Sequence, residues 1–212
     1  MNNIASAAWK RAGAHIYDPF LALGERRGMR ELRRNLLADA RGCVLEIGAG
    51  TGLNVPLYPP DVERLVLTEP EPGMARQLRH RAARARPDAE VVVAGAEALP
   101  FADMSFDAVV STLVLCTVSD PDAAIQEIQR VLRPGGQLLF IEHLRAEDEG
   151  LARWQERLAG AWQAFAAGCR CDRRTLDLLD GTFSLGETTH SEWRGMPAIV
   201  RPLASGAATR SS

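Results

Sequence analysis

The sequence predicts an α/β fold in which helices cover both faces of a mostly parallel sheet. Two observations support this prediction. Short apolar segments that suit buried strands alternate along the 212-residue chain with segments of helical periodicity. The first clear strand, residues 44–47, runs directly into glycines at three alternate positions, Gly48, Gly50 and Gly52. Glycine allows a tight turn and a close approach to a ligand, at the sheet edge where such folds bind their ligands.

Five apolar segments predict the parallel strands of this sheet. They lie near residues 43–47, 64–68, 90–94, 107–111 and 137–142. Helical segments between consecutive strands require crossover connections, which make the strands parallel. The sequence Pro134-Gly135-Gly136 ends the helix before the fifth strand, because proline has no amide hydrogen and glycine tolerates positive φ.

Helical patterns occupy the intervening segments. Residues 1–40 precede the first strand, and further helices are expected over 71–86 and 121–132. Asp120 before Pro121 is a favourable N-cap followed by proline in the first turn.

A last helix is expected over residues 147–169. Its large apolar residues recur every three or four positions, which predicts a face packed against the sheet. These residues are Leu151, Trp154, Leu158, Trp162 and Phe165.

An acidic residue closes the second strand. Glu69 follows Thr68 and lies 19 residues after Gly50. Because the carboxyl ends of neighbouring parallel strands meet at one edge, we expect Glu69 beside the glycine turn. A carboxylate there can accept hydrogen bonds from both hydroxyls of a ribose, so the sequence predicts a cofactor that contains adenosine.

The glycine spacing indicates which cofactor. The dinucleotide fingerprint G-x-G-x-x-G needs a third glycine where this chain has Leu53. Glu46, before the turn, would repel a pyrophosphate but suits a cationic cofactor. With these residues the chain resembles the class I methyltransferases, which use S-adenosylmethionine and whose first motif is an acidic strand end followed by G-x-G-x-G.

The resemblance implies a Rossmann-like fold with seven strands, the last antiparallel and spanning about residues 198–205. It implies one methyltransferase domain over 41–208, preceded by a helical lid segment over 1–40. The segment 94–101 would pass beside the adenine, where Gly95 stands in place of the usual aspartate. The implied cofactor-binding residues are Glu46, Gly48, Ala49, Gly50, Gly52, Glu69, Pro70, Met74, Ala96, Glu97, Thr112 and Leu113, with Tyr17 in the lid.

A narrower resemblance concerns the acceptor of the methyl group. Several segments are similar to the alkyl-thiol S-methyltransferases of the methyltransferase-like family: 113–118, Glu142-His143, Trp154 with Trp162, Gly168-Cys169 and 200–202. This implies methylation of the sulfur of a small apolar thiol, with S-adenosylhomocysteine as the second product. Vertebrate members are tethered to membranes through an apolar leader, whereas residues 1–40 here are polar and rich in arginine. We therefore expect a cytoplasmic protein.

His143 is the candidate base or orienting residue for the acceptor, since it directly follows the fifth strand and the pKa of histidine lies near neutral pH. The alternative is a structural role at the strand end. Cys116, Trp154 and Trp162 are candidate walls of the acceptor pocket, with ordinary core packing as the alternative. The spacing of Cys, His and acidic residues predicts no metal site.

Charge and composition limit the remaining possibilities. The net charge of −2 gives no indication of a nucleic-acid partner, and the four cysteines have no disulfide or zinc spacing. Arg26, Arg30, Arg33 and Arg34 can share one helix face, either as a solvated surface or as a weak contact with anionic lipid headgroups. The latter would favour a phospholipid or small-amine N-methyltransferase. A module that binds S-adenosylmethionine without catalysis is the third alternative.

Overall fold

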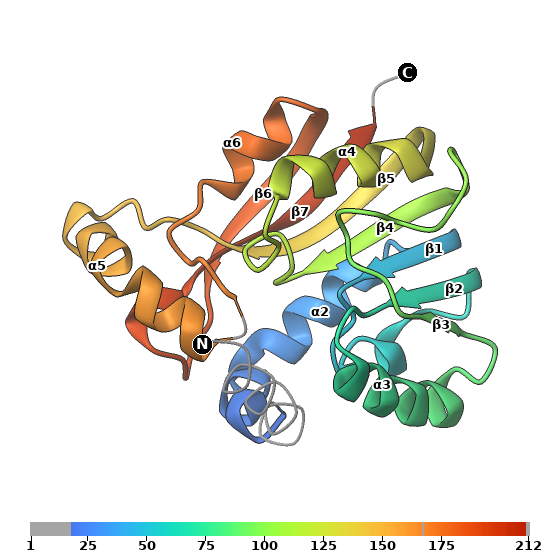
Figure 1. The fold of residues 1–212 in the computed structure, drawn as a ribbon, viewed down its shortest axis with the longest axis horizontal. Coiled ribbons are helices and arrows are strands. Elements are labelled where there is room, and N and C mark those ends of the chain that lie inside the picture. The colour runs from blue at the N-terminus through green and yellow to red at the C-terminus, as the bar shows by residue number, and fades with distance from the viewer. Residues whose placement is uncertain (1–17, 167, 211–212) are drawn as a thin grey trace, which may run out of the picture.

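A computed structural model describes residues 18–166 and 168–210 (Figure 1). Its seven strands form one sheet in the order β3-β2-β1-β4-β5-β7-β6. The pairs among β1 to β5 are parallel, whereas β7 runs antiparallel to both of its neighbours. The predicted seven-stranded sheet is thereby confirmed. The strands are β1 Gly42–Ile47, β2 Val62–Thr68, β3 Glu90–Val92, β4 Phe106–Thr112, β5 Leu132–His143, β6 Phe183–Glu192 and β7 Pro202–Arg210.

Local capping places two of the helices as the sequence predicts. The N-cap of α3 (Pro72–Ala85) is Glu71, whose carboxylate accepts a hydrogen bond from the amide of Met74 at 2.8 Å. The N-cap of α4 (Pro121–Val131) is Asp120, which accepts from the amide of Ala123 at 3.0 Å. Each cap satisfies an amide that has no partner inside its helix, so both helices begin at a fixed residue.

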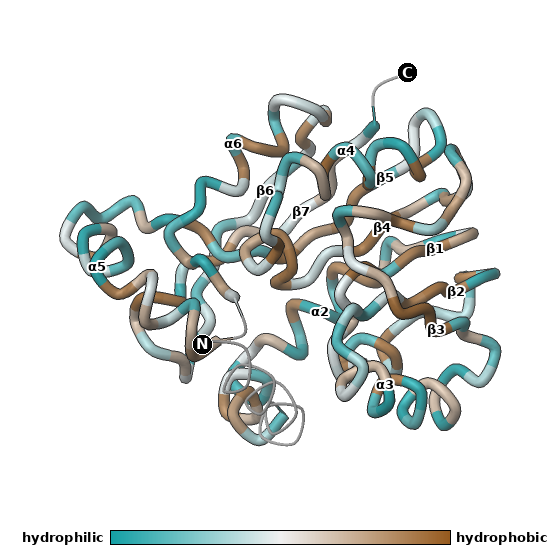
Figure 2. Tube along the Cα trace, in the orientation of Figure 1, coloured by the Kyte–Doolittle hydropathy of each residue, from teal (hydrophilic) through white to brown (hydrophobic). Residues whose placement is uncertain are grey.

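Helices cover both faces of the sheet. One apolar core packs α4 and α6 (Thr175–Asp180) against one face, and a second packs α2 (Arg30–Leu37) and α3 against the other. Figure 2 shows the apolar strands as a brown centre between more polar helices. A third apolar cluster lies beyond the carboxyl ends of β4 and β5 and joins the N-terminal helical region to residues 169–203. Packed apolar side chains of this third cluster therefore cover the carboxyl ends of β4 and β5.

The last strand begins later than predicted. Residues Ala198–Val200 form a short 3₁₀ turn, η3, and β7 begins at Pro202. Ile199 and Val200 are buried in the third cluster, which favours a turn over an extended edge. Proline is tolerated as the first residue of a strand because no ladder hydrogen bond is needed there. A similar turn, η2, spans Val55–Leu57.

The expected packing of the 147–169 helix is wrong. The helix α5 spans Glu149–Phe165, and Trp154 and Phe165 on the apolar stripe are 55% and 47% exposed. The buried side chains are those of Ala152, Gln155 and Ala159. The exposure of these side chains follows from the position of α5. This helix lies outside the sheet and contacts η3 rather than a broad apolar face (Figure 1).

The arginine face predicted in the N-terminal region is also wrong. Residues 18–24 are helical, but Gly28 in the turn η1 (Glu25–Met29) has φ of 128° and separates that helix from α2. Arg33 is buried rather than solvated, and it donates hydrogen bonds to Glu25 at 3.1 Å and to Asn54 at 3.0 Å. Among the described residues, no helix is both long and apolar enough to cross a bilayer.

Gln155 attaches α5 to the neighbouring loops and to η3 through a fully buried amide. Its Oε1 accepts from the amide of Ala146 at 2.7 Å, and its Nε2 lies 2.9–3.1 Å from the carbonyls of Leu144, Cys171 and Ile199. Gln155→Ala should therefore lower the free energy of unfolding by about 2–4 kcal/mol, because several buried polar groups lose their partner. Chemical denaturation measures this loss. Gln163→Ala, on the exposed side of the same helix, is the matched control, and equal effects of the two substitutions would contradict the assignment.

Candidate active site

The glycine turn after β1 has the geometry of a ligand cradle. Gly48, Gly50 and Gly52 have φ of 54°, 59° and 87°. A β-carbon on Gly48 would lie 2.8 Å from the side chain of Val114, and one on Gly52 would lie 2.8 Å from Leu78. A β-carbon on Gly50 would meet no protein atom within 4 Å. The outer glycines thus allow close packing, while Gly50 borders open space in which a ligand can approach the backbone.

Glu69 is held beside this turn, as the strand order predicts. Its two carboxylate oxygens accept hydrogen bonds from the amides of Gly50 and Glu71, each at 2.9 Å. Burial raises the pKa of Glu69, and the two amide donors oppose that rise. Each oxygen keeps a free lone pair, so the carboxylate can also accept from the hydroxyls of a ribose. Pro70 is exposed next to it, and Met74 is half-buried in the first turn of α3.

Glu46 belongs to a buried polar network below the turn. Its carboxylate accepts from the hydroxyl of Tyr58 at 2.7 Å and from the amide of Asn54 at 3.0 Å. Asn54 also donates to the hydroxyl oxygen of Thr112 at 3.0 Å and accepts from Arg33. Burial raises the pKa of Glu46 to about 7, against the lowering effect of the Tyr58 hydrogen bond. The network joins β1, η2 and β4 under the turn.

The N-terminal helical region reaches the glycine turn through one acidic side chain. Asp18 accepts a hydrogen bond from the hydroxyl of Thr51 at 2.6 Å and forms an ion pair with Arg81 at 2.7 Å. This contact places residues 18–24 close to the turn, on the side of α3. Tyr17, the residue expected in the lid, lies outside the described part of the chain.

The segment expected beside the adenine is held by its acidic residue. Glu97 accepts from the amide and the hydroxyl of Ser119 at 3.0 and 2.9 Å, and these contacts contribute to lowering its pKa although its partial burial opposes them. Ala96 is buried beside it. Glu97 thus ties this segment to the segment that follows β4.

Sequence reasoning missed the role of Glu142, the residue that holds the segment after β4. Its fully buried carboxylate accepts from the hydroxyl of Ser111 at 2.7 Å, and from the amides of Val114 and Leu115 at 3.0 Å each. The amide of Cys116 lies 3.3 Å away. Leu113, just before these amides, has φ of 61°, a strained conformation for leucine. The only signal in the sequence was an acid at the end of an apolar strand.

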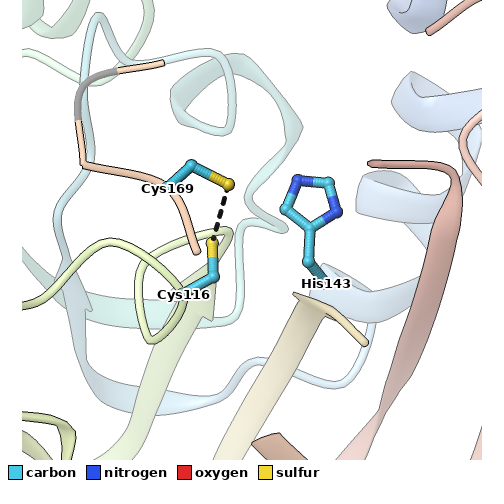
Figure 3. A group of neighbouring side chains, drawn as sticks. All are labelled: Cys116, His143 and Cys169. Carbon is cyan, nitrogen blue, oxygen red and sulfur yellow. Dashed lines mark hydrogen bonds between the residues drawn. The ribbon is translucent and has the colours of Figure 1, made fainter. Parts of the chain in front are cut away.

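Three side chains meet next to Glu142: His143, Cys116 and Cys169 (Figure 3). Their donor atoms lie within 4.8 Å of one another, and the two sulfurs are 3.8 Å apart. His143 is 4% exposed and stacks on Trp193, with ring centroids 5.7 Å apart. The contact with Cys116 lowers the pKa of Cys169, and His143 and Trp162 act in the same direction. The sequence named His143 and Cys116 but gave no reason to join Cys169 to them.

The predicted acceptor-site residues separate into two groups. Cys116 and Trp162 belong to the third apolar cluster, which surrounds His143 with Ile141 and Trp193. Trp154 lies elsewhere, exposed on α5 with the guanidinium of Arg157 5.7 Å from its ring centroid. The fold therefore brings His143, Cys116 and Trp162 together and leaves Trp154 apart.

Comparison with known proteins agrees with this geometry. Residues 45–140 match the family described as "Methyltransferase domain". The thiol S-methyltransferase TMT1A of Homo sapiens is 34% identical over 200 residues, covering 92% of this chain and 82% of that protein. The human thiol S-methyltransferase TMT1B is 37% identical over 172 residues, or 74% of this chain and 70% of that protein. The chain belongs to the class I S-adenosylmethionine-dependent methyltransferases.

Other similar proteins show the breadth of this family. A phosphatidylethanolamine N-methyltransferase from Cereibacter sphaeroides is 32% identical over 119 residues, covering 56% of this chain and 59% of that protein. The N-methyltransferase NodS from Bradyrhizobium japonicum WM9, solved with S-adenosylhomocysteine, has a TM-score of 0.65 at 21% identity, over 89% of this chain and 88% of that one. The protein is thus an enzyme that uses S-adenosylmethionine, and the open space at Gly50 beside Glu69 fits that cofactor.

Substituting the glycines of the turn should separate packing from cofactor binding. Gly48→Ala and Gly50→Ala share the strain of positive φ, about 1–2 kcal/mol each. Only Gly48→Ala adds a clash with Val114, so it should be the less stable variant. Gly50→Ala puts its methyl group where the cofactor approaches, so it should weaken S-adenosylhomocysteine binding at least roughly tenfold. Thermal melts and titration calorimetry measure the two effects, and unchanged affinity of Gly50→Ala would place the cofactor elsewhere.

The raised pKa of Glu46 should make the stability of the cofactor-free protein depend on pH. Between about pH 4.5 and pH 7 the native carboxyl keeps a proton that the unfolded chain has lost. The contribution of Glu46 to the free energy of unfolding therefore falls as the pH rises through this window, by up to about 3 kcal/mol. Urea denaturation of the wild type and Glu46→Gln at pH 5 and pH 8 isolates this change. Parallel pH profiles of the two proteins would show that Glu46 ionises normally.

Proposed function

We propose that this enzyme methylates the sulfur of a small, apolar thiol. The observation that carries the proposal is the third apolar cluster, in which His143 lies next to two buried thiols and an indole. An apolar surrounding suits an alkyl thiol better than a charged acceptor. The similarity to two thiol S-methyltransferases, TMT1A and TMT1B, supports the same acceptor.

Methyl transfer to a thiol requires little from the protein beyond the correct orientation of the two reactants. S-adenosylmethionine supplies a methyl group on a positively charged sulfur. The acceptor sulfur forms a bond to that methyl carbon as the bond to the donor sulfur breaks, and the thiol proton leaves to a base or to water. Correct alignment of two reactants can contribute about 7–11 kcal/mol. A thiol with a pKa near 8.5 is already a few per cent ionised at about pH 7, so a strong base is not essential.

In this proposal His143 lies at the acceptor and either accepts its proton or orients its sulfur. Glu142 acts indirectly as a positioning residue, since it fixes the segment 113–116 through backbone amides. Glu69 adds negative charge on the cofactor side, which suits the sulfonium and the ammonium group of the donor, and a bound cation would in turn favour the charged form of Glu46.

His143→Ala should lower turnover of an alkyl thiol by about 10- to 100-fold, because it removes the polar group beside the acceptor. The affinity for S-adenosylhomocysteine should stay unchanged, since His143 contacts none of the described groups of the glycine turn. Mass detection of the methylated thiol and titration calorimetry give the two readouts. His190→Ala, an exposed histidine paired with Glu147, is the control. Wild-type turnover in His143→Ala would remove His143 from the mechanism.

The same assay separates the alternatives when phospholipid amines and small amines are supplied beside alkyl thiols. An N-methyltransferase has support in the similar enzyme from Cereibacter sphaeroides and in a surface hollow bordered by Arg26, Arg27, Arg194 and Arg201. Methylated amine without methylated thiol would replace our proposal with this one. Binding of S-adenosylmethionine without any product would favour a non-catalytic module.

A further inference from the structure

Cys116, His143 and Cys169 form the most concentrated group of soft donor atoms among the described residues. All three side chains are buried, although they come from different parts of the fold. Cys116 follows β4, His143 ends β5, and Cys169 follows α5. Figure 3 shows the two sulfurs and one ring nitrogen turned toward a shared space. Two thiols and an imidazole are the ligands that zinc and similar soft divalent ions prefer.

The spacing of the sulfurs suits a shared metal ion. A tetrahedral zinc ion with Zn–S bonds of about 2.3 Å holds two sulfurs roughly 3.8 Å apart. The sulfurs of Cys116 and Cys169 are 3.8 Å apart in a thiol–thiol hydrogen bond, so they already have the separation of two ligands of one ion. The nitrogen of His143 is within 4.8 Å of both, so a small side-chain rotation completes three ligands.

Three nearby features fix the donor atoms in place. The amide of Cys116 lies 3.3 Å from the buried carboxylate of Glu142, which restrains the backbone of that ligand. The carbonyl of Cys116 accepts from the amide of Arg170 at 2.7 Å, which ties the segment of Cys169 to it. His143 stacks on Trp193, and its Nδ1 is buried without a partner among the described residues. A histidine that binds a metal through one ring nitrogen usually donates a hydrogen bond from the other, and Nδ1 is left for that role.

We propose that Cys116, His143 and Cys169 bind one zinc ion, or a similarly soft divalent ion, and leave its fourth position open to the acceptor. Resting on the proposed function, the occupant of that position would be the acceptor thiol, held as a thiolate after its proton leaves to solvent. The ion would then orient the acceptor sulfur, and His143 would serve as a ligand rather than as the proton acceptor. The acceptor sulfur would bond to the methyl carbon as the bond from that carbon to the sulfonium sulfur breaks, giving S-adenosylhomocysteine and a neutral thioether that binds the ion weakly. Three protein ligands with one open position are the pattern of catalytic rather than structural zinc.

The experiment measures metal binding by the full chain, without reference to turnover. Reduced protein, cleared of metal by a chelator, is titrated with Zn²⁺ against a chromophoric competitor and with Co²⁺ under visible spectroscopy. The wild type should take up one equivalent, and Co²⁺ should give tetrahedral bands with sulfur-to-metal charge transfer. Loss of an outer-shell partner alone costs about 10- to 100-fold in affinity, so Cys116→Ser, Cys169→Ser and His143→Ala should each lose at least roughly 100-fold.

Cys171→Ser is the matched control, because Cys171 is a buried thiol in the same segment as Cys169 but outside the group. It should bind metal as the wild type does. Each variant must also bind S-adenosylhomocysteine with wild-type affinity, which excludes misfolding as the cause of a loss. Absence of stoichiometric binding by the wild type, or equal binding by Cys171→Ser and the three ligand variants, would overturn the site.

Adding an alkyl thiol to the Co²⁺ protein tests the open position. A shift in the charge-transfer band without S-adenosylmethionine is expected, and an unchanged spectrum would contradict the open position. The two proposals can fail separately. Metal binding with these ligands but no methylated thiol would leave the site standing and refute the acceptor. Full thiol methylation by chelator-treated, metal-free enzyme would leave the acceptor standing and refute a role for the metal.

Discussion

A buried carboxylate is stable only when hydrogen-bond donors surround it, and this constraint shapes the whole carboxyl edge of the sheet. Glu46, Glu69 and Glu142 end three of the parallel strands and are at most 5% exposed. Each carboxylate accepts hydrogen bonds from groups in a loop that follows a strand. Glu69 fixes the glycine turn and the start of α3, and Glu142 fixes the segment after β4. The loops that form the site are therefore ordered by the ends of the strands.

The three carboxylates divide the edge between two tasks. Glu46 and Glu69 lie on the side of β1 and β2, where Glu69 borders the glycine turn that faces the methyl donor. Glu142 lies on the side of β4 and β5, where it holds the amides of residues 114–116 and so the backbone of Cys116. The strand β4, which pairs with both β1 and β5, lies between Glu46 and Glu142. In our proposals, charge selects the donor and soft, apolar groups select the acceptor.

Local rules in the sequence predicted much of this structure. The cap Asp120, the glycine turn and the position of Glu69 depend on residues close in sequence or on the strand order, so a pattern can show them. The prediction of an arginine face was wrong for two reasons. Gly28 breaks the helix, and Asn54, far away in sequence, accepts a hydrogen bond from Arg33 and keeps it away from solvent. The predicted packing of the apolar stripe on α5 was wrong because no sheet face lies under Trp154. Cys169 joins Cys116 across 53 residues, a proximity that only the tertiary fold creates.

The insertion of β7 between β5 and β6 has a consequence for synthesis. One edge of β5 pairs with residues 203–209, which are synthesised after β6. Until they arrive, that edge exposes unpaired backbone along Leu138 to Ile141, four of the most buried side chains in the finished protein. An exposed apolar edge strand is a site of intermolecular pairing. The nascent chain therefore exposes this edge from the synthesis of β5 until β7 has been made and has paired with it.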